Sequence, residues 1–139
     1  MPSHVSRINQ KTHRAQQLGK FGEDFAELFL LSIGYEIVER NWRGAHGEID
    51  LIARSNSHAN SKFGSDQSEY IFVEVKARSS LQFGAPLEAI TPEKYRRLFL
   101  LGREWISTNQ PRSLWRIDIV TILRGTEGIT LSHHKSLSA

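Results

Sequence analysis

The sequence contains no cysteine and a single methionine among its 139 residues. Without cysteine there is no disulfide scaffold and no metal site built from thiolates, which fits a protein of the cytoplasm. No apolar run approaches the roughly 18 residues of a membrane-spanning helix, and the first residues lack the apolar core of a signal peptide. We therefore expect a cytoplasmic location and no membrane partner.

A chain of this length predicts one domain, and a hydrophobic fraction of 39% is compatible with a globular core. The formal net charge of +3 suits an anionic partner such as nucleic acid, and it suits an ordinary charged surface equally well. Residues 1–12 are polar and include Arg7 and Lys11, so we predict a flexible basic N-terminal arm there. Residues 13–139 would form the single domain.

Two short apolar runs that carry acidic residues organise the middle of the chain. They are Glu48–Arg54 (EIDLIAR) and Tyr70–Lys76 (YIFVEVK), and polar residues separate them. Their β-branched and aromatic residues predict two strands, and two runs joined by a loop usually pair as an antiparallel hairpin. The intervening loop, residues 55–69, is long for a hairpin, which favours a tolerated insertion over a functional lid.

The register of this hairpin decides which side chains meet. Opposing Arg54 with Tyr70 creates three further pairs: Ile52 with Phe72, Asp50 with Glu74, and Glu48 with Lys76. Side chains alternate along a strand with a period of two, so these residues share one face of the sheet. Three carboxylates and one ammonium group are then predicted at one end of that face.

Like charges placed opposite one another on a sheet repel, so something must offset the repulsion between Asp50 and Glu74. Lys76 offsets part of it, and a divalent cation would offset more. Mg²⁺ typically binds one or two carboxylates together with waters and phosphate oxygens, and Mn²⁺ accepts the same ligands. Asp50 and Glu74 are therefore candidate metal ligands, and Lys76 is a candidate to orient a water or to stabilise charge developing at phosphorus.

Hydrophobic periodicity predicts the remaining elements. We expect a helix over residues 13–33, a strand over residues 35–43, and a second helix that starts at Thr91 as its N-cap. Residues 114–123 are apolar on both faces and predict a central strand, parallel to its neighbour because a helix crosses over between them. Residues 129–134 would add an edge strand. The predicted fold is α/β, with a three-stranded antiparallel meander, a crossover helix and a parallel fourth strand in a mixed sheet.

Asp118 lies inside the predicted central strand. A buried carboxylate needs a partner, so we expect an arginine or a backbone donor beside it and a structural role. Glu23 falls at the edge of the apolar stripe of the first helix, from where a carboxylate could reach over the end of a sheet. Taken alone, Glu23 is better explained as a solvated helix glutamate.

An ordered set of short motifs runs from about Leu18 to Val120. It comprises Gly19, Gly22 and Glu23, Gly34-Tyr35, Arg40-Asn41, residues 47–53 (GEIDLIA), residues 72–78 (FVEVKAR), Gly84, Pro86, Glu88-Ala89, Lys94, Trp105 and residues 116–120 (RIDIV). The aspartate followed by E-x-K on the next strand resembles the PD-(D/E)xK nuclease superfamily. The whole set resembles the YraN-like family of bacterial proteins, which are generally grouped with Holliday-junction-resolvase-type nucleases.

The resemblance implies a restriction-endonuclease-like core with a catalytic set of Glu23, Asp50, Glu74 and Lys76. Related nucleases often place an acidic residue of the first helix beside the metal, which favours Glu23 as a metal ligand, directly or through water. Glu48 would add a ligand or pair with Lys76. Structure-selective members of the superfamily often work as dimers, and the sequence leaves a monomer and a homodimer open.

Two basic residues are candidate contacts for DNA phosphates. Arg78 continues the alternation of Glu74 and Lys76, and Lys94 matches the family pattern. Arg96 and Arg103 on the same helix as Lys94 are better explained as solvated surface charges.

These residues, together with the resemblance, predict a Mg²⁺-dependent DNA endonuclease, with branched or damaged DNA as one candidate substrate. One alternative is a non-catalytic nucleic-acid-binding or scaffold protein that retains the nuclease fold, with the acidic cluster balanced by Lys76 and Arg78. Another is a metal-dependent phosphohydrolase for small molecules, which would have a closed pocket and little affinity for DNA.

Overall fold

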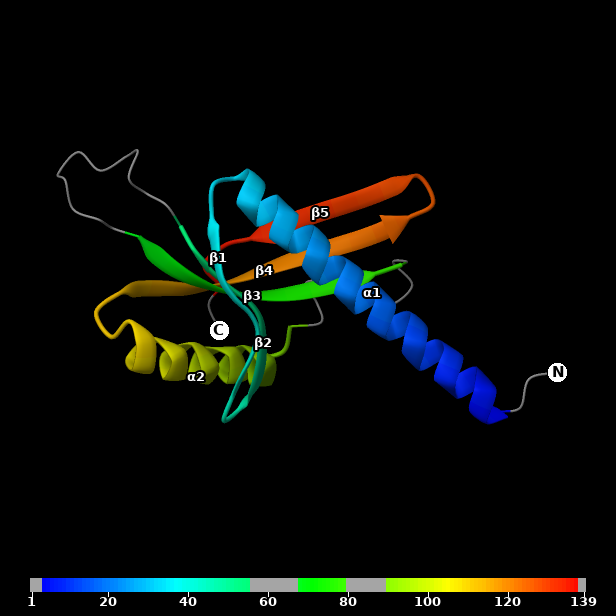
Figure 1. Ribbon diagram of the computed structural model, residues 1–139, viewed down its shortest axis with the longest axis horizontal. Coiled ribbons are helices and arrows are strands. Elements are labelled where there is room, and N and C mark those ends of the chain that lie inside the picture. The colour runs from blue at the N-terminus through cyan, green and yellow to red at the C-terminus, as the bar shows by residue number, and fades with distance from the viewer. Residues whose placement is uncertain (1–3, 56–67, 80–89, 138–139) are drawn as a thin grey trace.

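The computed structural model describes residues 4–55, 68–79 and 90–137, with side chains from His13 onward. In chain order its elements are α1 (His4–Ser32), β1 (Glu36–Gly44), β2 (Gly47–Arg54), β3 (Glu69–Arg78), α2 (Pro92–Asn109), β4 (Leu114–Gly125) and β5 (Gly128–His134) (Figure 1). Among these residues, no helix is long and apolar enough to cross a membrane.

The five strands form one mixed sheet in the order β1-β2-β3-β4-β5. The pair β3–β4 is parallel, and the other neighbouring pairs are antiparallel. Helix α2 makes the crossover between the two parallel strands, as a parallel connection requires. The predicted α/β class, the meander and the parallel fourth strand are confirmed, and the strand predicted over residues 129–134 is present as β5.

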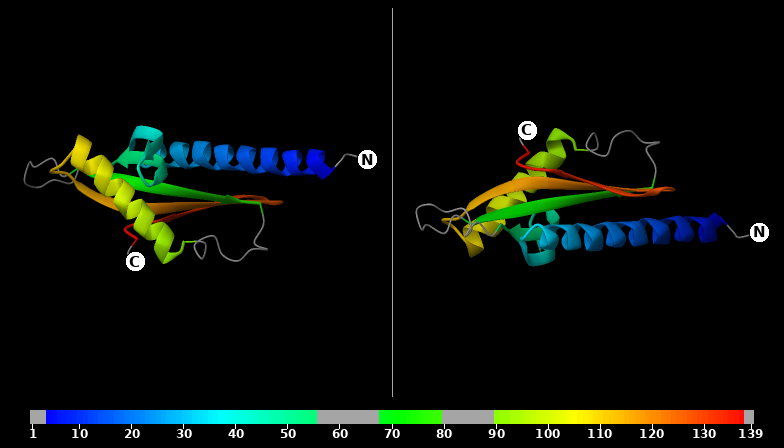
Figure 2. Two further views of the ribbon diagram at one scale, coloured as in Figure 1. Left: turned by 90° about the horizontal axis from the view of Figure 1, so that it is seen from below. Right: turned by 90° about the horizontal axis from the view of Figure 1, so that it is seen from above.

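The two helices cover opposite faces of the sheet, which gives three layers (Figure 2). One buried cluster lies under α1 and consists of Ala26, Leu30, Leu51, Ala53, Ile71, Val73, Val120 and Ile122. A second cluster lies under α2 and consists of Ile49, Ile52, Tyr70, Phe72, Leu101, Trp105 and Ile106. Each helix approaches the sheet closely through a glycine: a Cβ on Gly22 would lie 2.7 Å from the Cβ of Ala77, and one on Gly102 would lie 2.7 Å from the ring of Trp115.

The start of α2 was predicted correctly, but the start of α1 was not. Helix α2 begins as expected, because the Thr91 side chain accepts a hydrogen bond of 3.2 Å from the backbone N–H of Lys94. Helix α1 begins at His4 rather than at His13, so the predicted arm is helical from His4 on. No glycine or proline interrupts residues 4–12, and an established helix gains one backbone hydrogen bond for each residue added. The flexibility of this segment stays a prediction.

Asp118 on β4 is fully buried, as predicted, and has the expected arginine and backbone donors. Its carboxylate accepts hydrogen bonds from Arg116 Nε at 2.9 Å and from the Ser136 backbone N–H at 3.0 Å, and it lies 2.7 Å from His133 Nε2. Burial raises the pKa of Asp118, but these contacts lower it by more than burial raises it. The pKa of Asp118 therefore lies below its usual value.

Some predictions fall outside the described residues. They are the interior of the loop at residues 56–67, and the family positions Gly84, Pro86 and Glu88-Ala89.

Candidate active site at the divergence of β2 and β3

Strands β2 and β3 pair along only part of their length. The predicted partners Arg54–Tyr70 and Ile52–Phe72 are confirmed, but the pairing ends at Leu51–Val73. The predicted backbone pairs Asp50–Glu74 and Glu48–Lys76 are wrong, because β2 leaves β3 at this point. Asp50 nevertheless stays in contact with β3, since its Oδ2 accepts a hydrogen bond of 2.8 Å from the backbone N–H of Val75.

The hairpin of β1 and β2 diverges because it is attached to both helices. On one side, Arg40 of β1 makes ion pairs with three acidic residues of α1: Glu23 at 3.5 Å, Asp24 at 2.6 Å and Glu27 at 3.1 Å. On the other side, Trp105 of α2 donates a hydrogen bond of 3.1 Å to Glu39 of β1. Figure 1 shows the β1–β2 hairpin turning away from β3. These contacts hold it in that position between the two helices.

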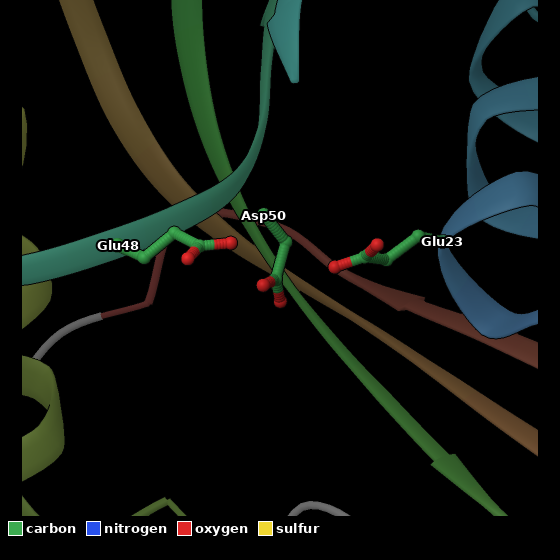
Figure 3. Close-up of side chains that lie close together, drawn as sticks. All are labelled: Glu23, Glu48 and Asp50. Carbon is green, nitrogen blue, oxygen red and sulfur yellow. The ribbon is translucent and has the colours of Figure 1, made fainter. Parts of the chain in front are cut away.

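Three carboxyl groups converge where the strands part. One oxygen from each of Glu23, Glu48 and Asp50 lies within 4.8 Å of the others. Glu23 reaches across from α1, Glu48 extends from β2 toward it, and the Asp50 carboxylate lies between the two (Figure 3). The structure therefore brings together two residues from the start of β2 and one from a helix more than twenty positions earlier.

Asn41 of β1 links two of these carboxylates. Its Nδ2 donates to Glu23 Oε1 at 3.0 Å and to Glu48 Oε1 at 2.9 Å. The backbone of Asn41 is left-handed, with φ of 54°, a conformation that asparagine tolerates better than most residues. Asn41 was not predicted as a site residue, and its signal in the sequence is its place in the Arg40-Asn41 motif.

Glu74 and Lys76 of β3 lie beside this group. Glu74 is only 8% exposed, and its Oε1 lies 3.9 Å from the ammonium nitrogen of Lys76. Burial raises the pKa of Glu74, and the positive charges of Lys76, Arg97 and Lys94 offset part of that increase. Burial and then the charge of Glu74 raise the pKa of Asp50 to about 8, against the hydrogen bond from Val75. The negative charges of the site are thus close enough to act on one another.

Basic residues of α2 lie close enough to the acidic groups to act on Glu74. Arg97 of α2 lies against the β1–β2 turn, where its Cδ is 3.5 Å from the position that a Cβ on Gly47 would occupy. Lys94, predicted as a phosphate contact, is in the first turn of α2 and its charge acts on Glu74. Arg78 is at the end of β3, and its Nε is buried without a hydrogen-bond partner among the described residues. Arg97 was missed because its proximity to the site depends on how α2 packs on the hairpin.

The donor set suits a hard divalent cation, because it consists of carboxylate oxygens, the ligands that Mg²⁺ and Mn²⁺ prefer. The residues that lie within 4.8 Å are Asp50 and the two further predicted ligands, Glu23 and Glu48. Glu74 lies outside this group of three but its charge acts on Asp50. The ligand set Asp50 and Glu74, with Glu23 and Glu48 added, stays a prediction.

The fold and the carboxylate cluster define an α/β protein with a candidate metal centre at the divergence of two strands. Residues 22–122 match the family described as "Uncharacterised protein family UPF0102". The chain is 42% identical to the UPF0102 protein of Rhodococcus jostii over 109 residues, which cover 78% of this chain and 83% of the relative. It is 41% identical to that of Beutenbergia cavernae over 118 residues, 84% and 91% of the two chains. It is 37% identical to that of Bacteroides fragilis over 118 residues, 85% and 88% of the two chains.

The chain therefore belongs to the UPF0102 family, and the resemblance to the YraN-like proteins is confirmed.

Proposed function

We propose that this protein is a metal-dependent DNA endonuclease that hydrolyses phosphodiester bonds, with branched or damaged DNA as its candidate substrate. The observation that carries the proposal is the convergence of Glu23, Glu48 and Asp50 within 4.8 Å, next to the Glu74–Lys76 pair. Carboxylates that repel one another are costly to gather in a partly buried place, and a divalent cation would relieve that cost.

Each residue has a role in this proposal. Asp50 and Glu74 would hold Mg²⁺ or Mn²⁺, with Glu23 and Glu48 as further ligands. The bound ion would supply positive charge that polarises the phosphodiester and stabilises the transition state. The Lys76 ammonium orients the attacking water and donates to oxygens on which negative charge develops.

The charges around the cluster support a polyanionic substrate. Lys94 and Arg97 extend from α2, and Arg78 lies at the end of β3. The charges of Arg97 and Lys94 act on Glu74, so both residues lie close enough to the acidic cluster to contact a phosphate bound there. DNA binding that weakens as salt rises would favour this substrate over a small phosphoester.

The test is cleavage of labelled single strands, duplexes, flaps and four-way junctions with Mg²⁺ or Mn²⁺. The variants are Asp50→Asn and Lys76→Met, and Glu127→Gln in the exposed β4–β5 turn is the matched control. We expect metal-dependent cutting by wild type and by the control, and its loss in both site variants. Activity that survives both site substitutions would refute the site, because a contaminating nuclease would behave in this way.

Calorimetric titration with Mn²⁺ tests the non-catalytic alternative. Folded wild-type protein that binds DNA but takes up no metal at millimolar concentration would make the scaffold function the better account.

A further inference from the structure

We propose that Asn41 is a positioning residue that sets the distance between Glu23 and Glu48 and thereby prepares the site for its metal. This inference rests on the proposed function and adds to it a residue outside the ligand set. A side-chain amide nitrogen carries two N–H groups, so Asn41 donates one to each glutamate, at 3.0 and 2.9 Å. One neutral group thus holds together two acidic side chains from different elements, α1 and β2.

The backbone of β1 directs this amide to the site. Asn41 lies between the paired positions Arg40–Leu51 and Trp42–Ile49. In a regular strand Arg40 and Trp42 would point to the same face. Instead Arg40 binds α1 while Trp42 packs in the cluster under α2. The left-handed φ of 54° at Asn41 therefore turns the strand over at this point, and its side chain lies where the two faces meet.

The second oxygen of each glutamate is held by an arginine. Glu23 Oε2 lies 3.5 Å from Arg40, and Glu48 Oε2 lies 3.2 Å from Arg43. The arginines supply positive charge, and the amide supplies direction without adding charge. Residues that hydrogen-bond to metal ligands in this way orient them, and their loss typically lowers metal affinity by about 10- to 100-fold.

A purely structural role makes a different prediction. If asparagine is present only because it tolerates the left-handed backbone, glycine should serve as well, since it adopts this conformation without steric cost. Asn41→Gly keeps the backbone and removes the amide, so it separates the two roles. The matched control is Asn109→Gly. It removes an amide that donates to the Trp105 carbonyl within α2, on a different element from Asn41.

The experiment measures Mn²⁺ affinity by calorimetry, with thermal unfolding of the metal-free proteins alongside. We expect Asn41→Gly to unfold within a few degrees of wild type but to bind Mn²⁺ ~10- to 100-fold more weakly. Asn109→Gly should bind as wild type does. DNA cleavage by Asn41→Gly should recover at saturating Mn²⁺, whereas cleavage by Asp50→Asn should not.

A double-mutant cycle shows whether Asn41 acts through Glu48. In a Glu48→Gln background, Asn41→Gly should cost less Mn²⁺ affinity than it does in wild type. Equal costs in the two backgrounds, or an Asn41→Gly protein that binds Mn²⁺ as tightly as wild type, would overturn the positioning role and leave the proposed function standing. Wild-type protein that binds no Mn²⁺ would refute the proposed function, and this inference with it.

Discussion

The carboxylate of Asp50 accepts a hydrogen bond of 2.8 Å from the backbone N–H of Val75 at the point where β2 leaves β3. A side chain thus replaces the backbone carbonyl that a continued strand would have offered. The same contact holds an acidic group next to Glu74, whose charge raises the pKa of Asp50. Asp50 therefore both anchors the end of the β2–β3 pairing and contributes a carboxylate to the candidate metal site.

Replacing Asp50 by asparagine should stabilise the metal-free protein while abolishing metal binding. The amide oxygen of asparagine retains the acceptor for Val75 and removes a charge that burial and Glu74 disfavour. With EDTA at pH 9, above the raised pKa of about 8, we expect the free energy of unfolding to rise by on the order of 2 kcal/mol. Urea denaturation measures this change, with Glu127→Gln as the control. A lower free energy of unfolding for Asp50→Asn than for wild type would contradict the conclusion that the charge of Asp50 destabilises the metal-free protein.

Two glycines of α1 should respond oppositely to alanine. The Cβ of Gly22→Ala would lie 2.7 Å from Ala77, and such overpacking typically costs about 1–3 kcal/mol. Around Gly19 nothing lies within 4 Å, so Gly19→Ala should stabilise the helix by about 0.5–1 kcal/mol. Thermal unfolding of both variants checks the prediction. Because Gly22 precedes Glu23, Gly22→Ala should also weaken Mn²⁺ binding, and equal Tm shifts in the two variants would argue against the close approach of α1.

Acid should destabilise the protein partly through Asp118. Its folded pKa lies below the unfolded value of 3.8, so the folded state releases this proton more readily than the unfolded state. The stabilisation is complete above pH 3.8 and is lost as the pH falls through the lower folded pKa. Urea denaturation at intervals between about pH 2.5 and 6 should show this loss in wild type, and Asp118→Asn should show less of it. A similar acid dependence in both proteins would assign the loss to other carboxylates.

The same substitution tests the buried network at neutral pH. Asp118→Asn leaves Arg116 without its charged partner on β4, which should cost on the order of 3 kcal/mol. The measurement is urea denaturation at pH 7. An unchanged midpoint would mean that Glu69 and Tyr35, which also bind Arg116, suffice to balance its charge.

Removing Arg97 should weaken DNA binding without changing its sequence preference. A residue that contacts only phosphate contributes electrostatically, so Arg97→Ala should reduce the salt slope of binding by about one. The matched control is Arg103→Ala, an exposed arginine on the same helix. Fluorescence anisotropy at several salt concentrations gives both slopes. Equal loss from the two variants would indicate a general effect of net charge rather than a contact next to the site.

Local patterns predicted the elements that depend on nearby residues. The alternation of Arg54, Ile52, Tyr70 and Phe72 identified the register of β2 and β3, and the Thr91 cap identified the start of α2. The apolar run on both faces of β4 indicated a central strand, which also predicted that Asp118 needs partners. These features follow from periodicity and from hydrogen-bonding requirements that short segments carry.

The geometry of the candidate site depends on contacts between distant elements. Extending the register past Leu51 paired Asp50 with Glu74, although the hairpin bends away there because Arg40 binds α1 and Trp105 binds Glu39. Asparagine tolerates a left-handed backbone, but its presence inside a predicted strand does not by itself indicate one. The acidic residues that converge here could therefore be identified as candidates from the sequence, but the end of the β2–β3 pairing and the place of Asn41 could not.

The left-handed backbone of Asn41 also bears on how this family could diverge. Glycine and aspartate are the replacements that this conformation accepts most easily, so the bend in β1 tolerates few substitutions. On the proposed function, a lineage that lost its acidic residues would no longer need the amide but would still need the bend. In a family member that has lost nuclease activity, we therefore expect glycine at this position together with replacements of Glu23 and Glu48.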